Sequence, residues 1–320
     1  MARHPQNNPT PLLDASFGEP EAMAQVLDAH PDYRVLRRLQ PKREFGLKRT
    51  GDVMKVLILD TETTGLDPAK DRIIELAMLS VDVDVDVASG RPIQVQDVFD
   101  ELEDPGIPIP AEATRVTGIT DSMVAGKRLD EARVAEVMRG AGLVIAHNAR
   151  FDRGFVERRL PAFSELPWAC SVAEIDWQSL GRGSAKLEFL AHELGWFYDA
   201  HRAEMDCHAL LAVLSAPLPN YPDETALGRL LQAAQTTSYR VCATGAPFES
   251  KDLLRARGYR WDAERKVWHT QLSSAAALEL EGGWLKAEVY KGRTVRIEIE
   301  RMTARERFSV RGGDVQHMTL

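Results

Sequence analysis

Two carboxylates, Asp60 and Glu62, follow the four apolar residues that open the segment VLILDTETTGL (56–66). Together they could hold a metal ion. Side chains two residues apart in a strand project from the same face, so both carboxylates would point the same way. Like charges at that spacing repel each other unless a cation lies between them. In a chain with 48 acidic residues, however, an isolated D-x-E is more often an ordinary strand end. The motif gains weight only from partners elsewhere in the chain.

A second polar group begins at the end of the segment LVIAHN (143–148), after its four apolar residues. His147 and Asn148 form a junction before a predicted helix, and Asp152 falls in the first turn of that helix. The helix dipole alone favours an acidic residue there, so Asp152 taken singly indicates little. Nevertheless, junctions between strands and helices at one sheet edge are where open α/β sheets bind their ligands.

The third group lies in AHRAEMDCHALL (200–211). Asp206 shares the apolar face of a predicted helix with Leu210, where a carboxylate is costly unless it is paired or binds a cation. His201 precedes Asp206 by five residues, in a loop. Imidazole can accept a proton from water at neutral pH, which makes His201 a candidate general base. A single loop histidine is otherwise more often a solvated surface residue.

The elements that must position these groups alternate between strand and helix patterns. Strands are expected at 56–60, 73–86, 94–102 and 143–148, and helices at 130–139, 151–160, 186–194 and 206–214. Three consecutive strands followed by alternating helices and strands predict a mixed α/β sheet flanked by helices.

The chain is long enough for a second, smaller unit. The segment PLPNYPDET (217–225) holds three prolines and no apolar periodicity, and is the best candidate boundary. A lead-in at the N-terminus shows helical patterns at 21–29 and 33–39. We therefore expect an N-terminal lead-in, the α/β domain, a linker or helix, and a small α+β domain, with bounds of 1–52, 53–218, 219–236 and 237–320.

Composition limits the class of protein. Three cysteines without a CxxC pair argue against a disulfide framework and against a structural zinc site. Neither a signal peptide nor an apolar run of membrane-spanning length is present, so we expect a cytoplasmic protein without a membrane partner. Residues 239–320 carry 15 Lys and Arg against 11 Asp and Glu, a balance of +4, which leaves −12 for residues 1–238. An acidic body disfavours nucleic acid unless bound cations reverse its local charge.

Taken in order, DTETTG, HNARFD and HRAEMD resemble the three motifs of the DEDD family of 3′–5′ exonucleases, which includes the DNA polymerase III proofreading subunit and ribonuclease T. The histidine five residues before the last aspartate is typical of the histidine subgroup. The resemblance covers residues 54–215, including VTGIT (116–120), and all five catalytic positions match. It implies a ribonuclease H-like mixed sheet.

The resemblance also implies the chemistry of the site. Two Mg²⁺ or Mn²⁺ ions would be held by carboxylates, with Asp60 bridging them, Glu62 and Asp206 completing the first and Asp152 holding the second. His201 would be the general base. Nucleoside 5′-monophosphates would be released from a free 3′ end.

Substrate contacts are expected from two groups of residues. In related enzymes the TETTG turn holds the terminal nucleotide, which here implies Thr63, Thr64, Gly65 and Leu66. The second group is His147 and Asn148. Gly65 is equally well explained by the needs of the turn itself. The motifs do not separate DNA from RNA.

The C-terminal region carries no catalytic motif. Residues 239–272 predict a small β-α-β-β unit with a hairpin across 262–266, similar to a GxRW…W module that accompanies DNA-processing enzymes. Its aromatic and basic residues suit single-stranded nucleic acid, namely Tyr259, Trp261 and Trp268 among Arg257, Arg260, Arg265 and Lys266. The favoured alternative is that both tryptophans belong to the core. The tail, 286–311, predicts a solvated strand pair.

We therefore expect a metal-dependent 3′–5′ exonuclease that acts on DNA in preference to RNA, with a polymerase or repair protein as its partner. An RNA-trimming exoribonuclease is the alternative within enzymes. A polymerase-associated scaffold with little turnover is the alternative outside them.

Overall fold

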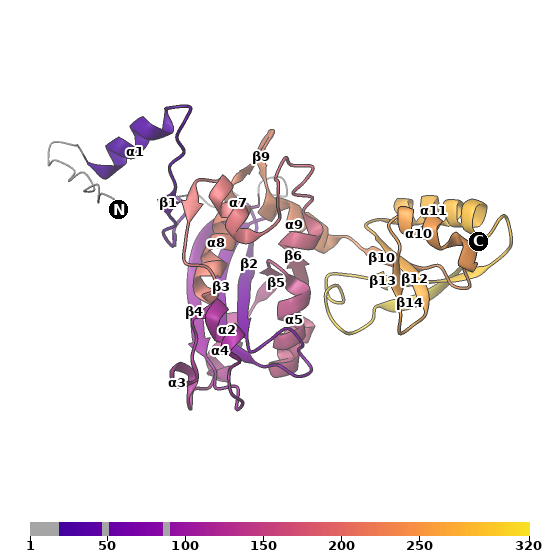
Figure 1. The fold of residues 1–320 in the computed structure, drawn as a ribbon, viewed down its shortest axis with the longest axis horizontal. Helices are drawn as coiled ribbons and strands as arrows, with labels where there is room; N and C mark the ends of the chain where they lie inside the picture. Colours follow the sequence, from indigo (N-terminus) through magenta and orange to yellow (C-terminus); the bar gives the residue numbers. More distant parts are fainter. Residues whose placement is uncertain (1–18, 47–50, 86–89) are drawn as a thin grey trace, which may run out of the picture.

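The structure is a computed structural model that describes residues 19–46, 51–85 and 90–320. Two lobes, each built on a five-stranded sheet, lie side by side (Figure 1). The strand order is β4-β3-β2-β5-β6 in the first lobe and β11-β12-β10-β13-β14 in the second.

The first sheet combines an antiparallel meander with two parallel strands. The meander consists of β2 (Val53–Thr63), β3 (Ile73–Asp84) and β4 (Arg91–Leu102). On the other side of β2, the strands β5 (Ala141–Ala146) and β6 (Trp168–Cys170) run parallel to it. The mixed sheet that the resemblance implies is confirmed.

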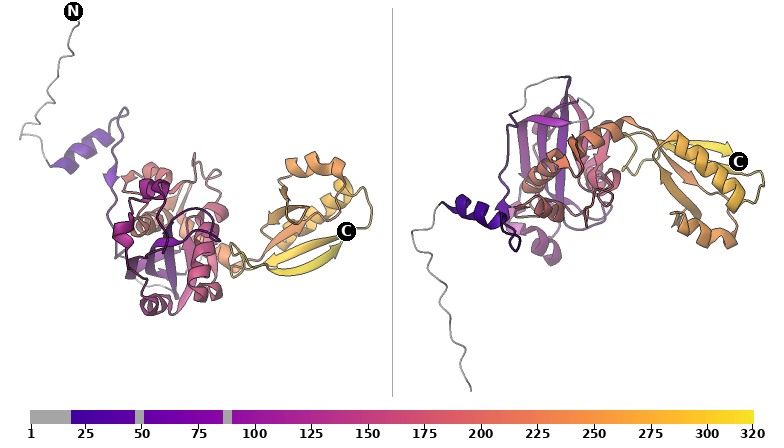
Figure 2. Two further views of the ribbon diagram at one scale, coloured as in Figure 1. Left: turned by 60° about the horizontal axis from the view of Figure 1, so that its bottom comes forward. Right: turned by 90° about the horizontal axis from the view of Figure 1, so that it is seen from above.

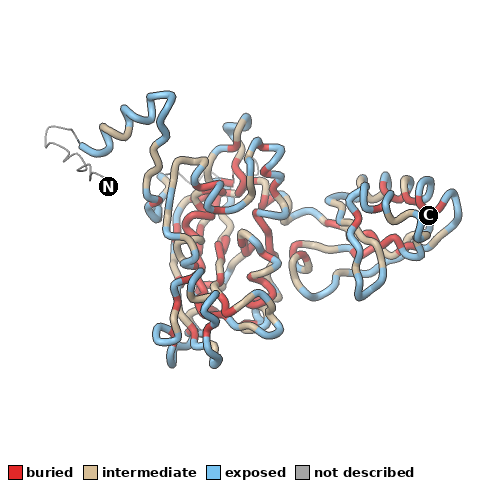
Figure 3. The backbone as a smooth tube through the Cα atoms, in the orientation of Figure 1, coloured by how far each residue is buried: buried red, intermediate tan, exposed pale blue. Residues whose placement is uncertain are grey.

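Helices cover both faces of this sheet because β2 is apolar on both sides. Val56 and Ile58 pack in one hydrophobic cluster with α7 (Leu187–Glu193) and α8 (Ala203–Ser215). Leu57 and Leu59 project the other way into a second cluster with α4 (Glu131–Met138) and α5 (Ala149–Arg159). Figure 3 shows the buried strands between these layers. Shorter helices fill the connections, namely α2 (Ala111–Thr117), α3 (Asp121–Val124), the 3₁₀ helix Pro161–Glu165 and α6 (Ser171–Glu174).

The N-terminal segment differs from its prediction in one helix. The helix expected at 21–29 forms as α1 (Pro20–Asp28), which has no buried residue and extends away from the first lobe (Figure 2). The helix expected at 33–39 is wrong. That segment instead contains β1 (Arg37–Arg38), which pairs in parallel with β7 (Trp196–Phe197). Backbone hydrogen bonds to this partner strand override the local helical pattern.

The segment expected to be a linker or helix, 219–236, contains part of a hairpin and a helix. Residues 217–225 form a hairpin of β8 (Pro217–Leu218) and β9 (Tyr221–Thr225), followed by α9 (Ala226–Gln235). Leu227, Leu230 and Leu231 of α9 are buried in the core of the first sheet. Hairpin and helix therefore extend the first lobe, and the connection to the second lobe is only Thr236 and Thr237.

The second lobe contains the expected β-α-β-β unit. Its elements are β10 (Ser238–Cys242), a 3₁₀ turn (Phe248–Ser250), α10 (Lys251–Ala256), β11 (Arg260–Asp262) and β12 (Val267–Leu272). They are followed by α11 (Ala275–Trp284), a π-helical turn (Leu285–Val289), β13 (Arg296–Met302) and β14 (Asp314–Thr319).

The solvated strand pair predicted for residues 286–311 is wrong. Lys286 lies in the helical turn, and β13 is paired on both sides. Ile297 and Ile299 of β13 are buried in the core of the second lobe, in one hydrophobic cluster with Leu254, Leu285 and Val289.

A loop between β13 and β14, residues 303–313, returns to the first lobe. Arg153 of α5 is fully buried beneath this 303–313 loop and donates hydrogen bonds to the backbone oxygens of Arg305 and Arg307, each at 2.6 Å. In the opposite direction, Arg307 forms a buried ion pair with Glu174 at 2.8 Å. The loop therefore joins the second lobe to the helix that carries Asp152.

None of the described helices combines the length and the apolarity needed to span a bilayer.

Candidate active site

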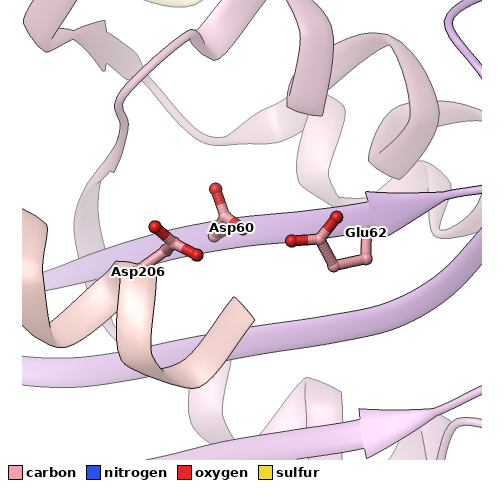
Figure 4. Close-up of side chains that lie close together, drawn as sticks. All are labelled: Asp60, Glu62 and Asp206. Atoms are coloured by element: carbon pink, nitrogen blue, oxygen red, sulfur yellow. The ribbon is translucent and has the colours of Figure 1, made fainter. Parts of the chain in front are cut away.

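A cavity of about 800 Å³ lies where β2 approaches its end, and three of the predicted carboxylates converge there. Asp60 and Glu62 come from β2 and Asp206 from the first turns of α8 (Figure 4). One carboxylate oxygen from each residue lies within 4.8 Å of the others. Asp60 and Glu62 therefore project from the same face of the strand, as expected. Asp206, from a segment far along the chain, lies beside them.

Asp152 lines the same cavity from α5 but stands outside this group of three. Its side chain is buried, and Thr61 Oγ1 donates a hydrogen bond to its Oδ1 at 2.9 Å. Thr61 lies between Asp60 and Glu62 in the strand and faces the α5 side of the sheet. The strand thus contributes two carboxylates from one face and, from the other, a threonine that holds Asp152 in place.

Burial, with the charges of neighbouring carboxylates, raises the pKa values of Asp60, Glu62 and Asp152 in the cavity. Burial and the charges of Asp152 and Asp206 hold the pKa of Asp60 well above its usual range. Burial, together with the Asp206 charge, raises the pKa of Glu62 to about 8, and burial raises the pKa of Asp152 to about 7. Several buried carboxylates therefore lie where their negative charges repel one another unless a cation is bound between them.

The donor set fits hard divalent cations. Carboxylate oxygens are the ligands that Mg²⁺ and Mn²⁺ prefer, and no cysteine lines this cavity. Asp60, Glu62 and Asp206 lie close enough to share an ion, while Asp152 could contribute to a second one.

His201 lies at the rim of this cavity, exposed, in the loop before α8. Its backbone has φ = 64°, a left-handed conformation in which histidine is one of the better tolerated residues. The next residue, Arg202, donates its backbone N–H to Asp206 Oδ2 at 3.2 Å, and the Tyr198 hydroxyl donates to Oδ1 at 3.0 Å. The loop that carries His201 is thereby tied to a carboxylate of the site.

Of the expected substrate contacts, His147 and Asn148 line the cavity. The imidazole Nδ1 of His147 is hydrogen-bonded to Ser171 Oγ at 2.7 Å, and burial lowers the pKa of His147 to about 4. His147 is therefore a neutral, oriented polar group at neutral pH. Asn148 is exposed at the start of α5.

Within the TETTG segment, Thr61 and Glu62 line the cavity, whereas the expected contacts from Thr63 to Leu66 lie next to it along the chain, outside the residues that line it. Thr63 and Thr64 are buried and bonded within the turn, Thr63 Oγ1 to the Gly65 oxygen at 2.6 Å and Thr64 Oγ1 to Asp71. A Cβ on Gly65 would come within 2.6 Å of the Asp71 carboxylate and displace it from its hydrogen bonds with Thr64 and Asp67, so the packing of the turn favours glycine. Leu66 is 84% exposed.

Residues 57–214 match the family model described as Exonuclease. This segment belongs to the exonuclease family. The match contains all the carboxylates of the cavity and His201. The three-motif resemblance is thereby confirmed at the level of the family.

Relatives of this exonuclease domain include DNA polymerase III proteins. A DNA polymerase III subunit epsilon-like protein from Rhodobacter capsulatus is 39% identical over 115 residues, which are 34% of this chain and 15% of the relative. The DNA polymerase III subunit epsilon of Treponema pallidum is 28% identical over 190 residues, covering 57% of this chain and 83% of the relative. A solved structure of exonuclease X with 5′ overhanging duplex DNA is 26% identical, with a TM-score of 0.39, and the match covers 54% of this chain and 99% of that one.

A positioning pair in the exonuclease domain, Glu75 and Arg202, is not among the residues predicted from the sequence. Glu75 is buried in β3 and accepts hydrogen bonds from Arg202 Nη2 at 2.7 Å and from the Ala203 backbone N–H at 3.0 Å. It thus fixes the first residues of α8, between His201 and Asp206. One signal was available: a single carboxylate inside the apolar run IIELAML must have a partner when it is buried. Nothing in the sequence identified Tyr198.

We expect Glu75→Gln to lower kcat about tenfold with little change in KM, because loosening the start of α8 misplaces His201 and Asp206. The amide replaces one acceptor oxygen by a donor that faces the donors of Arg202 and Ala203, so unfolding free energy falls by about 2–3 kcal/mol. Steady-state kinetics and urea unfolding measure the two effects. Asp82→Asn, on the same strand but away from the cavity, is the matched control; an equal loss of kcat there would refute the positioning role.

Proposed function

We propose that the protein is a metal-dependent 3′–5′ exonuclease that releases nucleoside 5′-monophosphates from DNA and acts in the cytoplasm. The observation that supports this most directly is the convergence of Asp60, Glu62 and Asp206, with ligand atoms within 4.8 Å of one another, in a cavity that Asp152 and His201 also line. A protein that only bound nucleic acid would have no chemical need for this repelling cluster.

The proposed roles follow from position. Asp60, Glu62 and Asp206 would hold one ion, and Asp152, sharing Asp60, a second. When bound, two such ions stabilise charge on the attacking and leaving oxygens of a phosphodiester. His201, at the solvent side of the cavity, accepts the proton of the attacking water. Arg202 and its partner Glu75 keep that loop in place.

The 3′-terminal nucleotide is proposed to lie between two groups. His147 and Asn148 offer polar atoms inside the cavity. The turn from Thr63 to Leu66 offers backbone groups and the exposed Leu66 side chain at its edge. DNA is favoured over RNA, with a polymerase or repair protein as partner, because the two relatives described are named as DNA polymerase III epsilon proteins.

The test is digestion of single- and double-stranded DNA and RNA labelled at either end, with Mg²⁺, Mn²⁺ or EDTA. Stepwise loss from the 3′ end of DNA, abolished by EDTA and by Asp60→Ala, is expected. Activity that survives either treatment would overturn the metal mechanism. Faster trimming of RNA would favour the exoribonuclease, and no digestion of any substrate would favour the scaffold.

We expect His201→Asn to slow hydrolysis by about 10²–10³-fold, as for the loss of a general base. Asparagine tolerates the left-handed backbone that His201 adopts, so the loop should keep its shape. Single-turnover rates at saturating substrate measure the effect. His192→Asn changes an exposed histidine on α7 and should leave the rate unaltered; a rate for His201→Asn within threefold of wild type would exclude His201 as the base.

A further inference from the structure

A continuous row of aromatic and basic side chains crosses one side of the second lobe. Lys251 Nζ lies 4.3 Å from the centre of the Phe248 ring. Arg255, one helical turn after Lys251 on α10, lies over the Trp268 ring at 5.9 Å. Trp268 contacts Trp261 across the β11–β12 ladder, with ring centres 5.6 Å apart. We refer to these five residues as the aromatic–basic surface.

Much of this surface is open to solvent. Phe248 is 76% exposed and Trp261 is 50% exposed, on β11 at the edge of its sheet. Trp268 is partly buried against the core of the lobe. The expectation that both tryptophans are core residues is therefore wrong for Trp261, because an edge strand has no neighbour on its outer side to cover it.

The cations beside the rings differ from those expected. Arg257 and Arg265 are ion-paired with Glu281 and Glu298. Arg260 is adjacent to Trp261 in a strand and so projects from the opposite face. Lys251 and Arg255 take their place; Arg255 has a solvent-exposed ion pair with Asp252 at 3.3 Å, whose contribution is small.

We propose that the aromatic–basic surface binds single-stranded nucleic acid. Exposed rings accept stacked bases and the intervening ammonium and guanidinium groups accept phosphates, whatever the base sequence. Charge favours this occupant: residues 239–320 carry +4, whereas residues 1–238, which include the catalytic cavity, carry −12 and repel a polyanion. The choice of nucleic acid rests on the proposed function.

The test measures binding of the full-length protein to a fluorescein-labelled oligothymidylate of about 15 nucleotides, a length matched to a small single-strand site. EDTA prevents digestion. Fluorescence anisotropy should show affinity weakened about tenfold by Trp261→Ala and largely retained by Trp261→Phe. Lys251→Gln should reduce the slope of log affinity against log salt by about 0.7, the value for one phosphate contact on a single strand.

Tyr221→Ala is the matched control, because Tyr221 is 47% exposed and stacked under Arg229 on the first lobe. Equal affinities for wild type and Trp261→Ala, or an equal loss in Tyr221→Ala, would overturn the proposal. Binding that Trp261→Ala weakens, with no digestion of any substrate in Mg²⁺, would refute the proposed function and support this surface. Digestion without any effect of Trp261→Ala on binding would do the reverse.

Discussion

Asp60→Asn is expected to abolish turnover and, in EDTA, to stabilise the protein. Loss of the central carboxylate removes metal-dependent stabilisation of the transition state, and several kcal/mol correspond to at least about 10³-fold in rate. Without metal, the same carboxylate faces the charges of Asp152 and Asp206 in a buried setting. Its neutral isostere avoids this repulsion and should raise unfolding free energy by about 1–2 kcal/mol at pH 8.

The sign of the pH dependence follows from the raised pKa values. Glu62 titrates near pH 8 in the folded protein against 4.5 ordinarily, and Asp152 near pH 7 against 3.8. Because the folded state binds more protons than the unfolded state between about pH 4 and 8, wild-type stability in EDTA falls as pH rises through that window. The advantage of Asp60→Asn should therefore grow from pH 5 to pH 8.

Thermal unfolding in EDTA at pH 5, 6.5 and 8, repeated with Mg²⁺, measures this prediction. Mg²⁺ should reverse the order, since it binds the wild type more tightly than the variant. Asp82→Asn again provides a control outside the cavity. Destabilisation of Asp60→Asn at pH 8 in EDTA would show that the carboxylate cluster is not repulsive.

Arg153→Met is expected to lower unfolding free energy by about 3–5 kcal/mol, the loss that follows when one partner of a buried ion pair is removed. Arg153 also donates to Glu157 at 2.7 Å and stacks near the Trp168 ring, so its loss leaves the Glu157 carboxylate and the carbonyls of the 303–313 loop without this donor. Since Asp152 is the adjacent residue, activity should fall as well.

Urea unfolding followed by circular dichroism measures the loss of stability, and limited proteolysis with trypsin measures opening of the loop, which contains Arg305, Arg307 and Arg311. Arg150→Met changes an exposed arginine on the same helix. If both variants unfold at the same urea concentration and are cleaved at equal rates, the loop does not depend on Arg153.

Local patterns predicted the sheet and the groups that it positions. The strand ending in Asp60 and Glu62 is apolar on both faces, which places it between two helical layers. Asp206 lies on the apolar face of its helix, where a carboxylate needs an ion-pair partner or a bound cation. The structure brings it to the same cavity as Asp60 and Glu62.

Features that depend on contacts distant in sequence could not be predicted in this way. Three examples are the pairing of Arg37 with Trp196, the burial of Leu227 beneath the first sheet and the hydrogen-bond partners of Arg153. In each case, the local sequence of one segment gives no indication of the segment that it contacts. Trp261 and Trp268 have the same side chain, and their places in the sheet, at the edge and in the interior, separate an exposed ring from a partly buried one.

The 303–313 loop has a consequence for the outer strand of the catalytic sheet. Strand β6 has β5 on one side, and on its open side the backbone N–H of Trp168 donates to the Ala304 oxygen at 2.7 Å. Open strand edges recruit strands from other molecules and so promote aggregation. A chain cut at Thr236 would keep every catalytic motif and yet expose this edge. By covering this edge, the second lobe also limits self-association of the first lobe. Its removal should therefore promote aggregation, whether or not nucleic acid binds to the aromatic–basic surface.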